Sequence, residues 1–373
     1  MTNAHYPLHS LQRRCWFKLI CGASFQHRPA VRSLILAYGL AGGDCIDVAA
    51  DAAVVAVARS AQEVIVSLAA EARRRGFRPQ RPWLMVSLND GDDPHFRKAV
   101  FDPARCPSDC PRPCEAVCPA EAITFQGDRP GVISERCYGC GRCLTLCPWN
   151  YITAQSHHAS PEAIASLLAD EADAVEIHTQ VEHYSHFHRL WHRAILPYAD
   201  RLKLIAVSCP DGEGVVEYLR TLHQLMSPLP CALLWQVDGR PMSGDLGIGT
   251  THATLRLARK VADADLPGYI QLAGGTNHHT VSALRRLQAE QHVAGQTPLP
   301  VAGIAYGSYA RAQFRPLLEQ LGSARLEDHP DLLWQAVAIA HNLVSQVKDA
   351  SAMLTASIEQ SSTLEAYPAR VTR

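Results

Sequence analysis

Short runs of apolar residues alternate along most of the chain with stretches whose apolar residues recur at helical spacing. Runs of this length without polar alternation are typical of strands buried on both faces. Eight of them occur, at residues 17–21, 45–49, 83–88, 174–178, 203–208, 231–236, 268–272 and 301–305. Helical patterns follow at about 29–41, 52–75, 161–170, 184–196, 214–226, 251–262, 280–290 and 309–321. The alternation predicts a parallel sheet with helical crossovers.

Eight strand–helix units are the number that closes a (β/α)8, TIM-like barrel, so we predict an α/β barrel. An open, doubly wound α/β sheet is the alternative. Ser160 is a suitable N-cap for the helix that Pro161 begins. A further amphipathic helix is expected at 330–349, on the outside of the barrel, and residues 355–373 are expected to be loosely ordered.

The alternation is interrupted once, between the third strand and its helix, by a segment rich in cysteine. Eight of the 13 cysteines of the chain lie within residues 106–147. The first four are Cys106, Cys110, Cys114 and Cys118, with three residues between each and the next and Pro119 directly after. The second four are Cys137, Cys140, Cys143 and Cys147, spaced x2, x2 and x3 and followed by Pro148. This second run is the bacterial ferredoxin pattern.

That spacing predicts how the cysteines divide between two clusters. Two intervening residues let a tight turn bring successive thiolates onto one cluster, and the cysteine before proline binds the other cluster. Cys118, Cys137, Cys140 and Cys143 are therefore expected to hold one [4Fe-4S] cluster. The remaining residues, Cys106, Cys110, Cys114 and Cys147, are expected to surround a second.

The first cysteine run departs from the ferredoxin pattern. The segment from Cys118 to Gln126 recurs 29 residues later as Cys147 to Gln155, but the offset grows to 31 at Cys106. The first run thus has one extra residue in each of two ligand loops, and the second cluster is [4Fe-4S], [3Fe-4S] or labile. Zinc and disulfides are the alternatives, but four-cysteine zinc sites do not need this spacing and no signal sequence favours disulfides.

The chain is therefore divided into four parts. Residues 1–100 form the first part of the barrel, 101–155 the inserted ferredoxin-like module, 156–330 the rest of the barrel, and 331–373 a C-terminal helix and tail. A net charge of −1 with 19% charged residues leaves no basic surface for nucleic acid. No apolar run reaches the roughly 18 residues of a membrane helix. Reduced cysteines fit a cytoplasmic protein with no membrane insertion.

Two glycine loops suggest a second site. They follow the seventh and eighth strands, where barrels commonly bind phosphate through backbone N–H groups. The candidate ligands are Gly274, Gly275, Thr276, Gly307, Ser308 and Arg311. We expect a phosphate-bearing ligand there, although such glycines also simply permit tight turns.

Other polar residues lie where the strands end. Cys21, Asp47, His178, Cys209 and Asp238 are expected at the carboxyl end of the barrel, with the polar loop 238–251 beside them. They suggest an enzyme site, but no nucleophile–base spacing is visible, so catalytic residues are not assigned. The dense histidine group His183, His186, His188 and His192 is expected on a helix, as a solvated face rather than a metal site.

The chain resembles the light-dependent period (LdpA) family of cyanobacteria. The segments that carry the resemblance are residues 15–24, the Ala-Gly-Gly-Asp-Cys-Ile-Asp-Val-Ala-Ala-Asp run at 41–51, the cysteine module, and 238–245. The resemblance implies an iron–sulfur protein that senses cellular redox state and tunes the period of the circadian clock to light. It also implies the Kai oscillator and its input histidine kinase as partners.

Two main hypotheses of function follow. The first is a redox-sensing protein without turnover, in which a change of cluster charge alters partner affinity. The second is an iron–sulfur oxidoreductase that passes electrons to a flavin or another phosphate-bearing ligand in the barrel mouth. A simple electron carrier would leave the barrel without a use.

Overall fold

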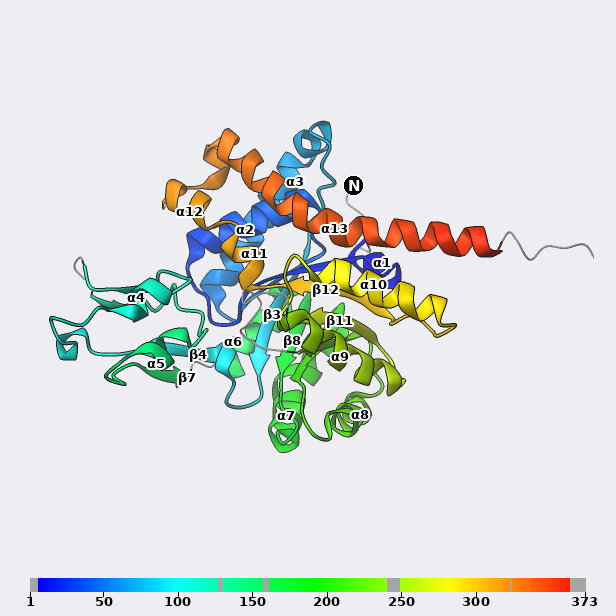
Figure 1. Cartoon of the computed structure of the whole chain (residues 1–373), viewed down its shortest axis with the longest axis horizontal. Helices are drawn as coiled ribbons and strands as arrows, with labels where there is room; N and C mark the ends of the chain where they lie inside the picture. Colours follow the sequence, from blue (N-terminus) through cyan, green and yellow to red (C-terminus); the bar gives the residue numbers. More distant parts are fainter. Residues whose placement is uncertain (1–5, 127–129, 157–160, 240–248, 323, 363–373) are drawn as a thin grey trace, which may run out of the picture.

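The eight predicted strands form one closed parallel barrel (Figure 1). The computed structural model describes residues 6–126, 130–156, 161–239, 249–322 and 324–362. The barrel strands are β1 (Trp16–Gly22), β2 (Cys45–Ala49), β3 (Trp83–Asn89), β8 (Ala174–His178), β9 (Leu204–Pro210), β10 (Ala232–Asp238), β11 (Tyr269–Ala273) and β12 (Val301–Tyr306). Each pairs with its neighbours in chain order, and β1 closes the barrel against β12. The (β/α)8 prediction is confirmed and the open-sheet alternative is wrong.

The crossover helices surround this barrel, as predicted. They are α2 (Arg28–Ala41), α3 (Ala52–Arg74), α6 (Pro161–Ser166), α7 (Tyr184–Leu190), α8 (Val215–Met226), α9 (Gly249–Asp263), α10 (Thr280–Val293), α11 (Ser308–Ala312) and α12 (Arg315–Leu321). The predicted helix 309–321 is therefore two helices. Pro316 explains the break, because it lacks the N–H that would continue the first helix and is well placed at the start of a new one.

Two other predicted helices are shorter than expected. α7 ends at Leu190, and the chain continues as a π turn at Trp191–Ile195 and a 3-10 helix at Leu196–Arg201. α6 ends at Ser166 and continues as a π turn at Leu167–Glu171. The predicted N-cap, Ser160, lies outside the described residues.

The C-terminal helix is longer than predicted. α13 (Pro330–Ser362) continues past residue 349, while residues 363–373 lie outside the described part of the chain. Its apolar face packs against α2, and Trp334 stacks on Phe77 with ring centroids 6.1 Å apart. Lys348 forms an ion pair with buried Asp44 at 2.6 Å, which ties the helix to the barrel near the start of β2.

The amino ends of the strands are closed by an apolar plug. A short helix, α1 (Tyr6–Gln12), which the sequence pattern did not predict, contributes Leu11 to it. Leu11 packs with Trp16 and Trp83, whose rings meet edge to face at 5.8 Å. The plug fills this end of the barrel with apolar side chains.

α3 differs from the expectation about apolar runs. Among the described helices it is the one long and apolar enough to cross a membrane by length and composition. Its buried residues, such as Val54, Ala58 and Ile65, lie on one face, and that face packs against α2 and the barrel. An apolar face buried in this way is typical of a core helix.

The cysteine module projects from the barrel on a two-stranded neck (Figure 1). Strands β4 (Arg97–Val100) and β7 (Thr153–Ser156) pair antiparallel, so the chain leaves and rejoins the barrel at one place. Between them lie α4 (Pro113–Val117), α5 (Arg142–Leu146) and the paired strands β5 (Ile123–Thr124) and β6 (Gly131–Val132). The insertion follows β3, at the carboxyl end of the barrel, as predicted.

Candidate functional site

Four of the module's cysteines gather around one cavity of about 100 Å³. We call them the inner set: Cys118, Cys137, Cys140 and Cys143. They come from two parts of the chain, because Cys118 follows α4 while the others lie in the turn before and within α5. This is the grouping that the ferredoxin spacing predicts. That these four residues bind a cluster stays a prediction.

The surroundings of the inner set suit an iron–sulfur cluster. The backbone N–H of Ala99 points at the Cys137 sulfur at 3.4 Å, and that of Ala122 at the Cys118 sulfur at 3.2 Å. Such N–H···S contacts stabilise the charge of a reduced cluster and raise its potential. Burial raises the pKa of the free Cys143 thiol to about 12, and neighbouring cysteines add to the effect. Four thiols around one mostly apolar cavity suit a cubane cluster.

The other four cysteines form an outer set: Cys106, Cys110, Cys114 and Cys147. Cys106 is hydrogen-bonded to Cys110, and both Cys106 and Cys147 act electrostatically on Cys114. Burial opposes ionisation of Cys147, but backbone N–H groups of residues 149–152 lower the pKa of its thiol overall. These N–H groups favour the charged form of the Cys147 sulfur, and the assignment of the outer set to a second cluster also stays a prediction.

A second cavity, of about 90 Å³, lies at the carboxyl end of the barrel. All six residues of the predicted phosphate site line it: Gly274, Gly275, Thr276, Gly307, Ser308 and Arg311. Cys140 of the inner set and its neighbours Tyr138 and Arg142 line the same cavity. The barrel mouth and the inner cluster position therefore share a wall.

Arg311 is engaged differently from the prediction. Its guanidinium lies 4.2 Å from the centre of the Tyr138 ring and donates a hydrogen bond of 2.8 Å to the carbonyl of Ile20. It bridges β1 to the inner cysteine loop, while its buried Nε has no hydrogen-bond partner among the described residues. Arg311 is thus a link between barrel and module first, and an anion contact only through its remaining donors.

The glycines of the seventh loop have a packing reason of their own. A side chain on Gly274 would meet the backbone of Asp238 at 2.7 Å, and one on Gly275 would meet the Thr250 carbonyl at 2.8 Å. Both residues have positive φ. The plain reading, that these glycines permit close packing, accounts for them without a ligand. Whether the loop also binds an anion stays a prediction.

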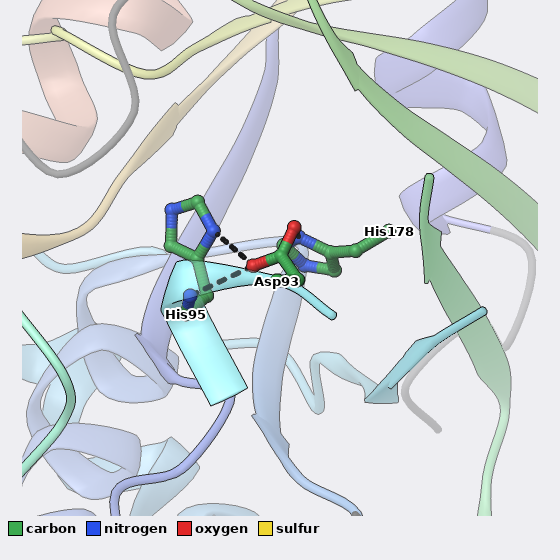
Figure 2. Close-up of side chains that lie close together, drawn as sticks. All are labelled: Asp93, His95 and His178. Carbon is green, nitrogen blue, oxygen red and sulfur yellow. Dashed lines mark hydrogen bonds and ion pairs between the residues drawn. The ribbon is translucent and has the colours of Figure 1, made fainter. Parts of the chain in front are cut away.

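Three of the predicted strand-end residues, Asp47, His178 and Asp238, reach the cavity. The other two, Cys21 and Cys209, are buried outside its lining, and burial raises the pKa of the Cys21 thiol to about 12. The structure adds two residues that the sequence did not single out, Asp93 and His95 (Figure 2). They follow β3, in the turn that begins the inserted segment, and face His178 at the end of the neighbouring strand β8.

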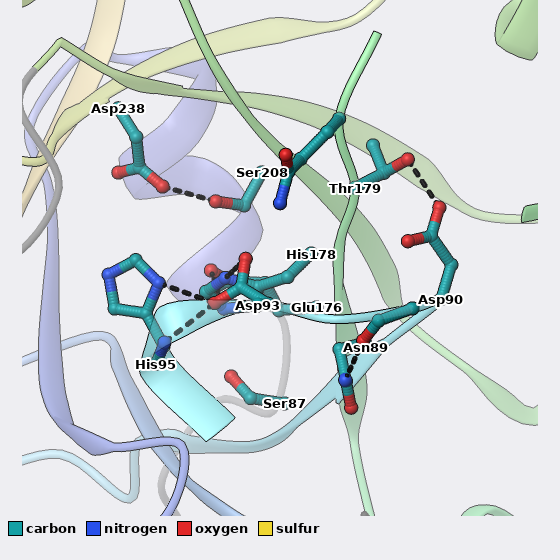
Figure 3. A network of polar contacts seen from close by, with 12 residues as sticks. Ser87, Asn89, Asp90, Asp93, His95, Glu176, His178, Thr179, Ser208 and Asp238 are labelled. Atoms are coloured by element: carbon teal, nitrogen blue, oxygen red, sulfur yellow. Dashed lines mark hydrogen bonds and ion pairs between the residues drawn. The ribbon is translucent and has the colours of Figure 1, made fainter. Parts of the chain in front are cut away.

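A buried polar network lies beneath these residues (Figure 3). Lys18 of β1 forms an ion pair with Glu176 of β8 inside the barrel, and both are fully buried. Glu176 also accepts hydrogen bonds from Gln236 at 2.5 Å and from His178 at 3.0 Å. The chain of side chains continues from Gln236 to Gln271 at 2.6 Å. Because a buried charge is costly unless paired, this network fixes the floor of the cavity.

The network sets the pKa values of the titratable side chains at the floor of the cavity. Burial and the nearby Glu176 raise the pKa of Asp47 to about 7, against the opposing charge of Lys18. Burial disfavours the charged form of His178, but its hydrogen bond to Glu176 and the charges of Glu176, Asp93 and Asp238 raise its pKa to about 9. Burial also opposes ionisation of Glu176, yet Lys18 and His178 lower its pKa to about 2.

The histidine-rich segment lies apart from the cavity lining. His183 contacts Asp90 at 2.9 Å, and the rings of His188 and His192 lie 4.4 Å apart. His186 and His188 are exposed, as expected for a solvated face. Most of the polar loop 238–251, residues 240–248, lies outside the described residues.

Comparison with known proteins decides the family. Residues 166–346 match the family model of the Light dependent period A C-terminal domain, and residues 106–158 match that of the LdpA Fe-S cluster-binding domain. The chain is 50% identical over 359 residues to Light dependent period A of Synechococcus elongatus, across 95% of this chain and 97% of that protein. The chain belongs to the Light dependent period A family.

The family relation covers both parts of the molecule. The LdpA cluster-binding domain begins at Cys106 and extends to residue 158, just past the neck strand β7. The chain thus carries an iron–sulfur cluster-binding domain inserted into an LdpA barrel. Among solved structures, the YdjI aldolase from Escherichia coli K12 aligns over 94% of this chain and 98% of that chain, with 9% identity and a TM-score of 0.41.

Sequence reasoning missed Lys18, Glu176, Asp93 and His95. A signal existed for two of them, because Lys18 and Glu176 are charged residues inside otherwise apolar strands, where an unpaired charge is rarely tolerated. Glu176 and His178 are two residues apart on β8, so both face the interior. Asp93 and His95 occur in a turn-rich segment whose composition explains them without a site.

Proposed function

We propose that this protein is a cytoplasmic redox sensor that conveys the light-dependent redox state of the cell to the circadian clock and adjusts its period. The inner set holds a [4Fe-4S] cluster and the outer set a second cluster, [4Fe-4S] or [3Fe-4S]. The Kai oscillator and its input histidine kinase are the partners. Membership of the Light dependent period A family supports the clock context.

One observation carries the sensing part of the proposal: the inner cysteines and the barrel mouth share a wall. Cys140 lines both cavities, and Tyr138 beside it packs on Phe25 and under Arg311. A cluster bound there supplies a one-electron change of charge. Arg311 and Tyr138 transmit a change of cluster charge to β1. This change becomes a signal if a partner binds the oxidised and the reduced protein with different affinity.

The contacts between module and barrel provide the path. Gln26, just after β1, hydrogen-bonds through its backbone to the carbonyl of Glu135 at 3.0 Å. Lys98 of the neck donates to the Ser134 carbonyl at 2.9 Å and to the Gln26 side chain. Arg315 of α12 pairs with Glu121 of the module. The first two contacts tie the loop before Cys137 to the segment after β1 and to the neck, and the third ties the segment after Cys118 to α12.

The proposal is tested by Cys140→Ser in a cyanobacterial host. Clock period is recorded at several light intensities, with Cys231→Ser as the matched control, because Cys231 is a half-buried cysteine outside both sets. We expect the light dependence of the period to be lost in Cys140→Ser and kept in Cys231→Ser. An unchanged period response in Cys140→Ser, in protein shown to lack the inner cluster, would contradict the sensor.

Partner binding gives a second test. Purified protein, oxidised and dithionite-reduced under argon, is titrated against the clock proteins and the input kinase. We expect affinities that differ between the two states by roughly 5–150-fold, the usual range for coupled sites. Equal affinities in both states would exclude redox-dependent signalling through these partners.

An oxidoreductase is the second candidate, favoured by the position of the predicted phosphate residues around the cavity that Cys140 lines. In this case the cavity takes a phosphate-bearing group such as that of a flavin. Equilibrium dialysis of the cluster-loaded protein with flavin mononucleotide tests it. Binding that Ser308→Ala and Arg311→Met weaken would support an enzyme, and no binding at millimolar ligand would count against it.

A further inference from the structure

Three potential metal ligands converge at the barrel mouth, outside both cysteine sets. The ligand atoms of Asp93, His95 and His178 all lie within 4.8 Å of one another (Figure 2). The Asp93 carboxylate lies between the two rings, 2.8 Å from His95 Nδ1 through one oxygen and 3.9 Å from His178 Nδ1 through the other. Asp93 and His178 are buried, and His95 is half-buried.

These separations suit a single ion. Two ligands each about 2.1 Å from a tetrahedral ion lie roughly 3.4 Å from each other. The two distances in the structure, 2.8 and 3.9 Å, lie on either side of that value. The separation between the two imidazole nitrogens also stays within 4.8 Å, so rotations of the His95 and His178 rings would bring the three ligands toward one centre.

The residues behind His178 hold it as a metal-binding histidine is usually held. Its Nε2 contacts Glu176 Oε1 at 3.0 Å, which leaves Nδ1 facing Asp93. Histidines that bind metals commonly donate their other ring N–H to a carboxylate in this way. Glu176 is itself fixed by Lys18 and Gln236, so the orientation of the ring is determined by the barrel interior.

A further carboxylate, that of Asp47, lies on the cavity side of these three ligands. Asp47 lines the cavity and is buried, and its Oδ2 has no hydrogen-bond partner among the described residues. Its other oxygen accepts a hydrogen bond from Ser87 at 2.7 Å. A buried, unpartnered carboxylate oxygen is costly unless a cation, a proton or a bound molecule reaches it. Asp47 lines the same cavity as His95 and His178, so a proton or a ligand bound there satisfies this oxygen.

We propose that Asp93, His95 and His178 bind one divalent transition-metal ion of the zinc and ferrous-iron class. Two imidazoles and a carboxylate are the ligand set of catalytic zinc sites and of open non-haem iron sites. The open coordination position faces the cavity that Asp47, Asp238 and Cys140 also line. The site is distinct from the cysteine sets and takes a small oxygen-bearing ligand.

The experiment measures zinc in the full chain with its clusters intact, because zinc is counted separately from cluster iron. Protein is dialysed anaerobically against a series of buffered zinc concentrations, and zinc and iron are counted by mass spectrometry. The variants are His95→Ala and Asp93→Asn, with His188→Ala as control because His188 and His192 are an exposed pair that could bind zinc adventitiously.

We expect one zinc per chain in the wild type and in His188→Ala, and affinity lower by roughly 10–100-fold or more in His95→Ala and Asp93→Asn. Equal affinity in all four proteins, or loss of zinc in His188→Ala alone, would overturn the site. Iron content and thermal unfolding show whether each variant is folded. If His95→Ala is not, the isosteric Asp93→Asn decides.

X-ray absorption at the zinc edge gives a reading that needs no variant. We expect nitrogen and oxygen ligands at about 2.0–2.1 Å with imidazole scattering. Sulfur ligands at about 2.3 Å would place the zinc in a cysteine set and overturn the proposal. Iron counts from the same sample exclude displacement of cluster iron as the source of the signal.

Discussion

The inner and outer cysteine sets are built from a repeated sequence, yet they occupy different surroundings. The inner set lies against the barrel, with a defined cavity, two N–H···S contacts and Arg311 over Tyr138. The outer set lies beside exposed residues: Leu146 and Trp149, which flank Cys147, are 45% and 51% exposed. The inner cysteines thus surround a cavity that adjoins the barrel mouth, whereas the outer cysteines lie near solvent.

This difference suggests a division of labour between the sets. The widened loops of the outer set are held by prolines and by two stacked arginines, Arg105 on Tyr151 and Arg112 on Phe125. The inner set is held by the barrel itself. If both sets bind clusters, we expect electrons to enter through the outer side and to affect the protein at the inner side.

The largest expected effect comes from removing one cysteine of each set. Cys143 lies in the module's core on α5, and Cys147 of the outer set follows the same helix one turn later, so Cys143→Ser should lose both clusters. Cys106→Ser, at a half-buried position, should keep roughly half the iron. Iron and sulfide counting with electron paramagnetic resonance measures this. Equal losses in the two variants would remove the asymmetry.

Next in size is the pH dependence of the barrel mouth beneath the inner set. Lys18 of β1, Glu176 and His178 of β8, and Ser87 of β3 face Asp47. Its pKa is raised to about 7, so the stability linked to its proton is present below about pH 4 and lost as pH rises through 7. In Asp47→Asn this loss is absent, and the unfolding free energy should gain about 2–4 kcal/mol on the wild type between pH 4 and pH 8.

Chemical denaturation at several pH values, with chelator present, measures that difference. The control is Asp109→Asn in the outer loop, where the aspartate is exposed and no such change with pH is expected. If the unfolding free energies of wild type and Asp47→Asn stay parallel from pH 4 to pH 8, Asp47 is not the buried, protonated group that its surroundings indicate.

A smaller effect is expected on the two cluster potentials. Arg311→Met removes a half-buried positive charge beside the inner set and should lower the inner potential by on the order of 20–60 mV. Arg105→Met removes an exposed charge beside the outer set, and screening by water should leave a smaller shift. Redox titration followed by electron paramagnetic resonance reads both clusters. Shifts of equal size would show that the barrel gives the inner set no distinct electrostatics.

The smallest effect on the fold is expected from Trp149→Ser. Because Trp149 is exposed, its loss should change the unfolding free energy by no more than about 0.5 kcal/mol and leave the iron content intact. If partners bind at the outer side, their affinity falls while stability does not. A clear drop in the denaturation midpoint would show instead that Trp149 contributes to the stability of the fold.

The barrel could be predicted because each of its strands is buried on both faces and reads as a short apolar run. β4 and β7 were missed because each has only four residues and neither shows an alternating apolar pattern. α1 was missed because only Leu8 and Leu11 of its helix are apolar and large. The extra length of α13 depends on tertiary packing, and the helix break before Pro316 depends on that proline. The apolar pattern predicts neither boundary.

Part of the candidate site could likewise be predicted from the sequence, and part could not. Cysteine spacing fixes which thiols share a turn, so the two sets could be grouped from the sequence. The pair of Lys18 and Glu176 is 158 residues apart and becomes visible only when the barrel closes. His178 and Asp93 meet because β3 and β8 are neighbours across the inserted module, a relation that the sequence order hides.

The pairing of β1 with β12 also governs the timing of synthesis. The barrel cannot close until Tyr306 has left the ribosome, which is 306 − 147 = 159 residues after Cys147. At about 5–20 residues per second, translation leaves roughly 8–30 s between the two events. During that interval all eight cysteines of the module have been made, while Arg311, which lies over Tyr138 beside the inner set in the finished fold, has not. We therefore expect the inner cysteines to be more accessible to iron–sulfur assembly factors in the nascent chain than in the finished protein.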